Sequence, residues 1–203
     1  QGEIALQRGT TAGTTTQKRD GMALQAMASY ALPVAELEKY KPVVSGSYTY
    51  VSGDKSASGS PDNNHKNSAW NPMFENQGGG TIYNSIFNLS NLQILNATVS
   101  ASPIADVTTS LSWNGLWAAQ KLTAGTQAGI ATTSLVQPDG SSFSPQVTSN
   151  KALGSEYDAN VAYQYTEDVK FGLNLGWFVP GRAFTAANHD IATQAIASVG
   201  VNF

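Results

Sequence analysis

Cysteine, charge and long apolar runs are all scarce in this 203-residue chain. Cysteine is absent, which excludes disulfides and thiolate metal sites. Charged residues make up 12% of the chain, and the 11 basic and 14 acidic side chains leave a formal net charge of -3. No apolar run approaches the roughly 20 residues that a membrane-spanning helix needs. Neither a disulfide scaffold nor a helical membrane protein is therefore expected.

The few basic residues do not gather into a patch. They are spread from Arg8 to Arg182, so the usual footprint of phosphate-backbone binding is missing and nucleic acid is not an expected partner. The chain starts at Gln1 without a basic segment, an apolar core or a cleavage site. Either a signal peptide has been removed or the numbering begins inside a longer protein, and we expect the second.

What the chain does have is two-residue alternation, which is typical of strands with two different faces. In the clearest segment, one face carries Val169, Phe171, Leu173, Leu175, Trp177 and Val179, and the other carries Lys170, Gly172, Asn174, Gly176 and Phe178. The same pattern predicts eight strands, at 1–9, 20–32, 42–52, 88–101, 107–119, 154–166, 169–180 and 190–203.

Connections of two lengths join these segments in turn. The longer ones lie at 10–19, 53–87, 120–153 and 181–189, and the shorter ones at 33–41, 102–106 and 167–168. Outer-membrane β-barrels connect their strands by long extracellular loops and tight periplasmic turns. With Phe203 at the periplasmic edge, all four longer connections are predicted to lie outside the cell.

Aromatic residues separate a membrane barrel from a soluble β-sandwich, because a barrel carries aromatic girdles at both membrane interfaces. A sandwich is expected to concentrate its large side chains in the strand middles instead. Here the strand middles hold small or aliphatic residues, and the aromatics on the lipid-facing parity lie near strand ends. The predicted lipid-interface aromatics are Tyr30, Tyr48, Tyr50, Trp113, Trp117, Tyr163, Tyr165, Phe171, Trp177 and Phe203. The sequence thus predicts an all-β, antiparallel transmembrane barrel.

Five short stretches extend this prediction to a family. They are YTYVSGD at 48–54, WNPMF at 70–74, NLSNLQ at 88–93, LGSEYD at 153–158 and GWFVPG at 176–181. Through these stretches the chain resembles the C-terminal portion of the alginate-export family of outer-membrane β-barrels. The resemblance implies a barrel of about eighteen strands. Residues 1–203 are then expected to form one barrel segment, with further strands before Gln1.

The opposite parity is predicted to line a pore. Its side chains are mostly neutral hydrogen-bonding groups, and its charges lie near strand ends. The predicted pore-lining residues are Gln25, Ser45, Ser47, Thr98, Ser110, Ser112, Asn114, Glu156, Asp158, Asn160, Gln164, Lys170, Asn174, Asp190, Gln194 and Ser198. Such a lining suits water and hydroxylated solutes. An exporter of the polyanion alginate is instead expected to line its pore with Arg and Lys, and this section has almost none.

The sequence gives little support to the hypothesis that the protein is an enzyme. Glu156 and Asp158 lie on one face, about 7 Å apart, but no nucleophile accompanies them, and solvated carboxylates at the pore rim are the expected interpretation. Neither His65 nor His189 has metal-ligand spacing. The loop that contains Asp62 lacks the regular spacing of a calcium site. We therefore expect no catalytic residues, no bound metal and no cofactor.

The leading prediction is a channel in a bacterial outer membrane for passive diffusion of neutral or weakly charged solutes, sugars among them. Two alternatives remain open: an alginate-type polysaccharide export channel, and a structural or adhesive barrel with a plugged lumen. The expected partners are outer-membrane lipid, the assembly machinery of that membrane, and a small solute or a polysaccharide.

Overall fold

The computed structural model describes residues 1–11, 17–54, 66–72, 79–122 and 146–202. These residues form an antiparallel sheet with almost no helix. Nine strands belong to it: β1 (Gly2–Thr11), β2 (Gln17–Ala31), β3 (Val43–Val51), β4 (Lys66–Asn67), β5 (Leu92–Ile104), β6 (Val107–Ala118), β7 (Ala152–Gln164), β8 (Val169–Pro180) and β9 (Ala192–Val201).

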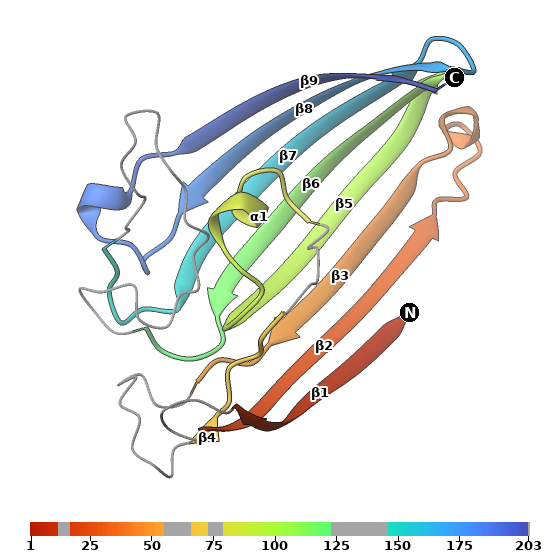
Figure 1. Cartoon of the computed structure of the whole chain (residues 1–203). Coiled ribbons are helices and arrows are strands. Elements are labelled where there is room, and N and C mark those ends of the chain that lie inside the picture. Colours follow the sequence, from red (N-terminus) through yellow and green to blue (C-terminus); the bar gives the residue numbers. More distant parts are fainter. Residues whose placement is uncertain (12–16, 55–65, 73–78, 123–145, 203) are drawn as a thin grey trace.

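Eight of the nine strands form one continuous path, in the order β1-β2-β3-β5-β6-β7-β8-β9. Every neighbour along this path is antiparallel and next in sequence, apart from the very short β4. The sheet is strongly curved, and its edge strands β1 and β9 do not meet, so it is an open section of barrel-like wall (Figure 1). The prediction of an all-β antiparallel wall is confirmed, whereas a closed barrel of about eighteen strands is not seen.

The ninth strand, β4, was not expected from the sequence. It pairs in parallel with β2, where Lys18 lies opposite Lys66 and Arg19 lies opposite Asn67. At this level β3 has already ended, because its last residue, Val51, pairs with Ala23. Two residues of the long connection thus continue the sheet beyond β3.

Several predicted boundaries were wrong for local reasons. The fifth segment was expected to begin at residue 88, but β5 begins at Leu92, because Asn91 adopts a left-handed backbone with φ 54°. Asparagine tolerates this conformation better than most residues. The Asn91 side chain then accepts a hydrogen bond from the backbone N–H of Gln120 (2.6 Å), which stabilises the turn before β5. The second strand begins at Gln17 rather than 20, because its hairpin with β1 continues to the Thr11–Gln17 pair.

The two ends of the sheet differ in their connections. Between β5 and β6 only residues 105–106 intervene, and between β7 and β8 only 165–168. The opposite end carries the stretches 52–91, 119–151 and 181–191. We call the two ends the short-turn end and the long-loop end.

Three short helices lie in the described connections. At the long-loop end they are α1 (Tyr83–Ile86) and η2 (Ala186–Asn188), and at the short-turn end η1 (Glu38–Tyr40). None of the helices in the described ranges is long and apolar enough to span a membrane.

Candidate functional site: the concave face of the sheet

One face of the curved sheet encloses a cavity of about 660 Å³. Its lining comes from strands as far apart as β1 and β8, which contribute Glu3 and Asn174, so this face is the concave one. The opposite, convex face exposes large apolar side chains in most strands, such as Ile4, Leu111 and Val199. Two-residue alternation therefore separates a polar concave face from an apolar convex face.

A band of neutral polar side chains occupies the middle of the concave face. We call it the polar band, and its members are Gln25, Ser47, Thr49, Asn96, Thr98, Ser112, Asn114, Asn160 and Asn174. Because paired strands place register partners side by side, these residues form rows across the sheet. One row runs from Asn96 to Asn114, and another from Thr98 to Ser112.

Hydrogen bonds connect the polar band across neighbouring strands. The Asn96 amide donates to Asn114 Oδ1 (2.8 Å), and the Thr98 hydroxyl donates to Ser112 Oγ (2.9 Å). On the β1 side, Gln25 Nε2 donates to Thr49 Oγ1 (3.2 Å). On the β8 side, the Asn174 amide donates to Asn160 Oδ1. These contacts position hydroxyl and amide groups at the cavity wall, where their remaining donors and acceptors suit a hydroxylated ligand.

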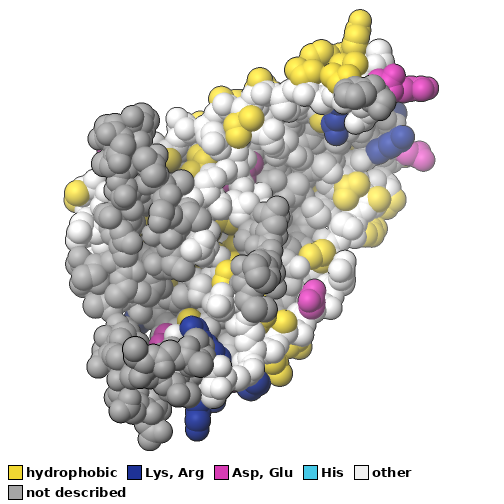
Figure 2. Space-filling model, in the orientation of Figure 1, with side chains coloured by type: hydrophobic (Ala, Val, Ile, Leu, Met, Phe, Trp, Pro, Cys, Tyr) yellow, Lys and Arg dark blue, Asp and Glu magenta, His cyan; other side chains and the backbone are white. Residues whose placement is uncertain are grey.

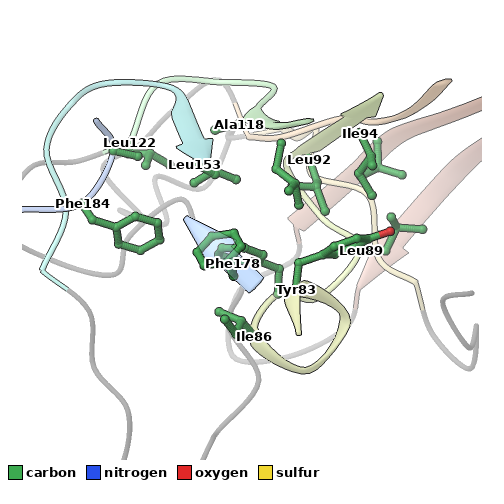
Figure 3. Packing of buried hydrophobic residues seen from close by; sticks show 14 of the residues in the cluster. Tyr83, Ile86, Leu89, Leu92, Ile94, Ala118, Leu122, Leu153, Phe178 and Phe184 are labelled. Carbon is green, nitrogen blue, oxygen red and sulfur yellow. The ribbon is translucent and has the colours of Figure 1, made fainter. Parts of the chain in front are cut away.

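The long connection between β3 and β5 returns to the concave face at residues 79–89, which include α1. We call these residues the inward segment. Ile82, Tyr83, Ile86, Phe87 and Leu89 are all buried, and they pack with strand residues of the concave parity at the long-loop end. Figure 3 shows Tyr83 and Ile86 beside Phe178, with Leu92 and Ile94 of β5 nearby. Part of this long connection thus packs against the concave face, a position that strand alternation did not predict.

Two carboxylates on β7 hold the inward segment. Glu156 is fully buried, and its two carboxylate oxygens accept the backbone N–H groups of Ile82 (2.9 Å) and Tyr83 (2.5 Å). Asp158 accepts the Thr81 N–H (3.3 Å) and the Asn114 side-chain amide (3.0 Å). The expectation of solvated rim carboxylates was therefore wrong, since both carboxylates are buried and bonded to protein groups.

Glycine makes room for this contact. A Cβ on Gly176 would lie 3.1 Å from Thr81 Cβ and 3.3 Å from Asp158 Oδ1, so a larger residue would push the inward segment away from β8. The Tyr83 ring is buried beside Glu156, and this burial raises the pKa of its phenol above the usual value of 10.0. Tyr83 is thus neutral near pH 7, as a ring packed against two carboxylates must be.

The inward segment divides the concave side into two spaces. Gly80 and Tyr83 line the cavity beside the polar band, whereas Ile82 and Ile86 line a second space of about 620 Å³ against β8 and β9. Among the described residues, the inward segment therefore narrows the space on the concave side at the level of α1 and leaves a cavity on either side of it.

Most of the predicted pore-lining residues lie on the concave parity. Those that line the larger cavity are Gln25, Ser47, Thr98, Ser112, Asn114, Asp158, Asn160 and Asn174. Asp190 and Gln194 line the second space. Ser110 lies beside this group and accepts a hydrogen bond from Asn160 (3.3 Å), and Ser45 is the register partner of Thr98. Gln164, Lys170 and Ser198 lie apart, exposed toward the short-turn end.

The predicted lipid-interface aromatics fall into two groups on the convex parity. Trp113 pairs in register with Tyr157, which was not among the predicted aromatics, and Tyr157 pairs with Trp177. Toward the short-turn end, the rings of Tyr163, Tyr165 and Phe171 contact one another, with centroids 6.0–6.4 Å apart. Tyr30, Trp117 and Trp177 are exposed, Tyr48 and Tyr50 are half-buried, and Phe203 lies outside the described residues.

Some residues that matter at this site were not predicted from the sequence. Thr49 and Asn96 share the concave parity of Ser47 and Thr98, two residues away, so alternation alone could have found them. The apolar docking surface of the inward segment also left a signal. Leu92, Ile94, Leu116 and Phe178 are large apolar residues on the otherwise polar parity, and all four are buried.

In the described ranges, no three His, Cys, Asp or Glu side chains lie close enough together to hold a metal ion. His65 lies outside those ranges, and His189 is exposed.

Comparison with known proteins shows which family the sequence matches. The family model described as alginate export matches residues 1–198, which is nearly the whole chain. The match supports an outer-membrane β-barrel of the polysaccharide-export type, a family of transport proteins and not of enzymes. No curated protein matches the chain.

Proposed function

Because the chain belongs to the alginate export family, we propose that it forms part of the wall of an outer-membrane channel that exports a polysaccharide. The observation that carries the proposal is the polar band, which lines a cavity of about 660 Å³ on the concave face. Sugar hydroxyls exchange hydrogen bonds readily with Ser, Thr, Asn and Gln side chains. A chain of sugar residues could therefore move along this face without being held at one point.

Charge at the cavity wall bears on the kind of saccharide. The charged residues that line the larger cavity are Glu3 and Asp158, and none of the described lining residues is Lys or Arg. Asp158 is already engaged with Thr81 and Asn114. Anion selectivity in a pore arises from rings of Arg or Lys. The described wall thus suits a saccharide recognised by its hydroxyl groups rather than by carboxylates.

The same observation supports a second candidate, passive diffusion of neutral or weakly charged solutes such as small sugars. Both functions need an open lumen with a hydrogen-bonding wall. They differ in the length of the solute, because an exporter must accommodate many linked sugar residues in single file. A plugged structural barrel is the remaining alternative, and the inward segment that narrows the concave side is the feature in its favour.

Single-channel conductance in planar bilayers tests these functions. An export channel is expected to conduct ions, and long oligosaccharides added to one side should interrupt the current for longer than short ones. Equal interruption by short and long sugars would favour passive diffusion. Absence of conductance would rule out both channel functions and leave the plugged barrel. Strong anion selectivity would contradict recognition through a neutral wall.

A further inference from the structure

A basic cluster lies at the long-loop end of β1, β2 and β4. We define it as Arg8, Lys18 and Lys66, arranged around Asp20. The Asp20 carboxylate forms ion pairs with both Arg8 and Lys66, which belong to β1 and β4, the two strands that pair with β2 at this level. Lys18 is exposed, two residues before Asp20 on β2. Figure 2 shows dark blue side chains near this end of the molecule, close to where Figure 1 places β4.

All four side chains belong to the convex face of the sheet. Arg8 has the parity of Ile4 and Leu6, which are exposed at 68% and 60%. It is the register partner of Asp20, and Lys18 is the register partner of Lys66. Since register partners point to the same side, the cluster lies directly beyond a convex apolar surface and not in the cavity.

The depth of the cluster places it beside the headgroup region of a membrane. Tyr50, one of the predicted interface aromatics, pairs with Leu24, and Asp20 lies four residues from Leu24 toward the long-loop end. Four residues span about 13 Å along a strand, or roughly 10 Å along the membrane normal at the usual tilt. The polar region on each side of a bilayer is about 5–8 Å thick. The backbone of the basic cluster therefore lies at the outer edge of this polar region, and the long Arg and Lys side chains can reach back to the headgroups.

The described side chains of the cluster do not balance in charge. They are three cations and one carboxylate, of which Arg8 and Lys66 pair with Asp20, so two positive charges remain among them. Asp20 is only 19% exposed, because Arg8 and Lys66 cover it, whereas Arg8 and Lys66 are themselves 60% and 58% exposed. Arg19, which lies between Lys18 and Asp20 on β2, has the concave parity. Asp20 thus fixes two cations in place and leaves much of their hydrogen-bonding surface accessible.

We propose that the basic cluster binds the phosphate groups of an anionic glycolipid in the outer leaflet of the outer membrane. Arginine and lysine are the usual partners of phosphate oxygens, and basic residues beside a membrane are attracted to anionic headgroups. The apolar side chains of Ile4, Leu6 and Met22 below the cluster would contact the acyl chains of the same lipid. This site depends on the orientation of the barrel and not on its cargo.

The test measures binding of lipid A to the purified protein in detergent, with dephosphorylated lipid A as the second probe. The informative variant is K18Q/K66Q, which removes two charges and keeps the Arg8–Asp20 pair. Its matched control is K39Q/K41Q, which removes two exposed lysines at the short-turn end. K18Q alone serves if the double variant does not fold, because Lys18 has no ion pair among the described residues.

Lipid A is expected to bind K18Q/K66Q about tenfold more weakly than the parent, and the control variant is expected to bind as the parent does. Removing the phosphates, or raising the salt concentration, should weaken binding to the parent in the same way. Binding of K18Q/K66Q within twofold of the parent would overturn the proposal, and so would equal binding of dephosphorylated lipid A. If a soluble oligouronate displaces lipid A at a concentration below that of the lipid, the cluster binds an anionic saccharide instead. The single-channel conductance of K18Q/K66Q is also measured, so that a loss of lipid binding is distinguished from a loss of the channel function.

Discussion

Glu156 shows how one residue changes role between the local pattern and the folded protein. On the strand it is a polar residue of the concave parity, next to Asp158. In the structure its carboxylate is fully buried and accepts two backbone N–H groups of the inward segment. A buried carboxylate is costly unless its oxygens are hydrogen-bonded. The contact therefore ties the position of the inward segment to this single side chain.

Replacing Glu156 with Gln is expected to loosen the inward segment. Glutamine keeps the shape but offers one acceptor oxygen in place of two, so either the Ile82 or the Tyr83 N–H loses its partner, at a cost of about 1–3 kcal/mol. Amide hydrogen exchange at Ile82 and Tyr83 should become faster, and single-channel conductance should rise. E3Q is the control, because Glu3 is a carboxylate of β1 that lines the same cavity and belongs to a different strand from Glu156. Unchanged exchange at both amides would show that Glu156 does not hold the segment.

The polar band makes a second prediction at the residue scale. The double variant T98V/S112A removes two hydroxyls from the cavity wall, where they are bonded to each other. Each hydrogen bond lost to a sugar costs about 0.5–1.5 kcal/mol, so affinity for a neutral oligosaccharide should fall about tenfold. The measurement is the sugar concentration that half-blocks the channel current. The control is T109V, which removes a hydroxyl of β6 on the convex parity and should leave the half-blocking concentration unchanged. If both variants lose the same affinity for the sugar, the polar band does not contact it.

At the scale of the element, alternation assigned the faces of the strands well. The parity predicted for the pore and for lipid agrees with the concave and convex faces of β2, β3 and β5 to β9, because successive side chains of any strand point to opposite sides. The aromatic rows on the convex face are also spaced as a membrane requires. Trp117 and Val107, the partner of Tyr163, are ten residues apart on β6. That is about 33 Å along the strand and about 25 Å at the usual tilt, close to the apolar band of an outer-membrane barrel.

Lysine substitutions at adjacent positions of β8 test this assignment. Leu173 is exposed on the convex face, and Asn174 lines the cavity on the concave face. L173K should destabilise the protein by about 2–4 kcal/mol, because it places a charge in the hydrocarbon layer, whereas N174K should cost much less. The two are compared by urea unfolding after insertion into lipid vesicles. Equal destabilisation would mean that the convex face does not contact lipid.

Strand ends were predicted less well than strand faces. Alternation continues into residues 88–91, yet the left-handed Asn91 ends it and starts β5 at Leu92. Backbone conformation at a corner depends on contacts from other segments, here the Gln120 amide and the Ser52 carbonyl. Two-residue periodicity carries no information about such partners.

For the whole molecule, the unequal connections predict its orientation in the membrane. Long connections gather at one end of the sheet, as extracellular loops do in outer-membrane barrels. Because the chain has no cysteine, single cysteines can be introduced without background labelling. R182C, at the long-loop end, should react in intact cells with a maleimide that does not cross the outer membrane. D168C, in a short turn, should react only after the cells are permeabilised.

The reverse labelling pattern would invert the proposed orientation, and with it the leaflet assigned to the basic cluster. Labelling of both cysteines in intact cells would show that the protein does not separate two compartments in this way. The parent protein serves as the control for nonspecific reaction.

The sequence by itself determined which side chains share a face, which strands are neighbours and which end carries the long connections. These features are local, because side-chain direction alternates along every strand and short turns force antiparallel pairing. Only the tertiary structure decided that residues 79–89 return to the concave face, that Glu156 is buried beneath them, and that Lys66 joins Arg8 around Asp20. Each of these joins distant segments, as in the bond between Ile82 and Glu156, 74 residues apart. Such contacts form only when the curved sheet brings their partners together, so no local pattern encodes them.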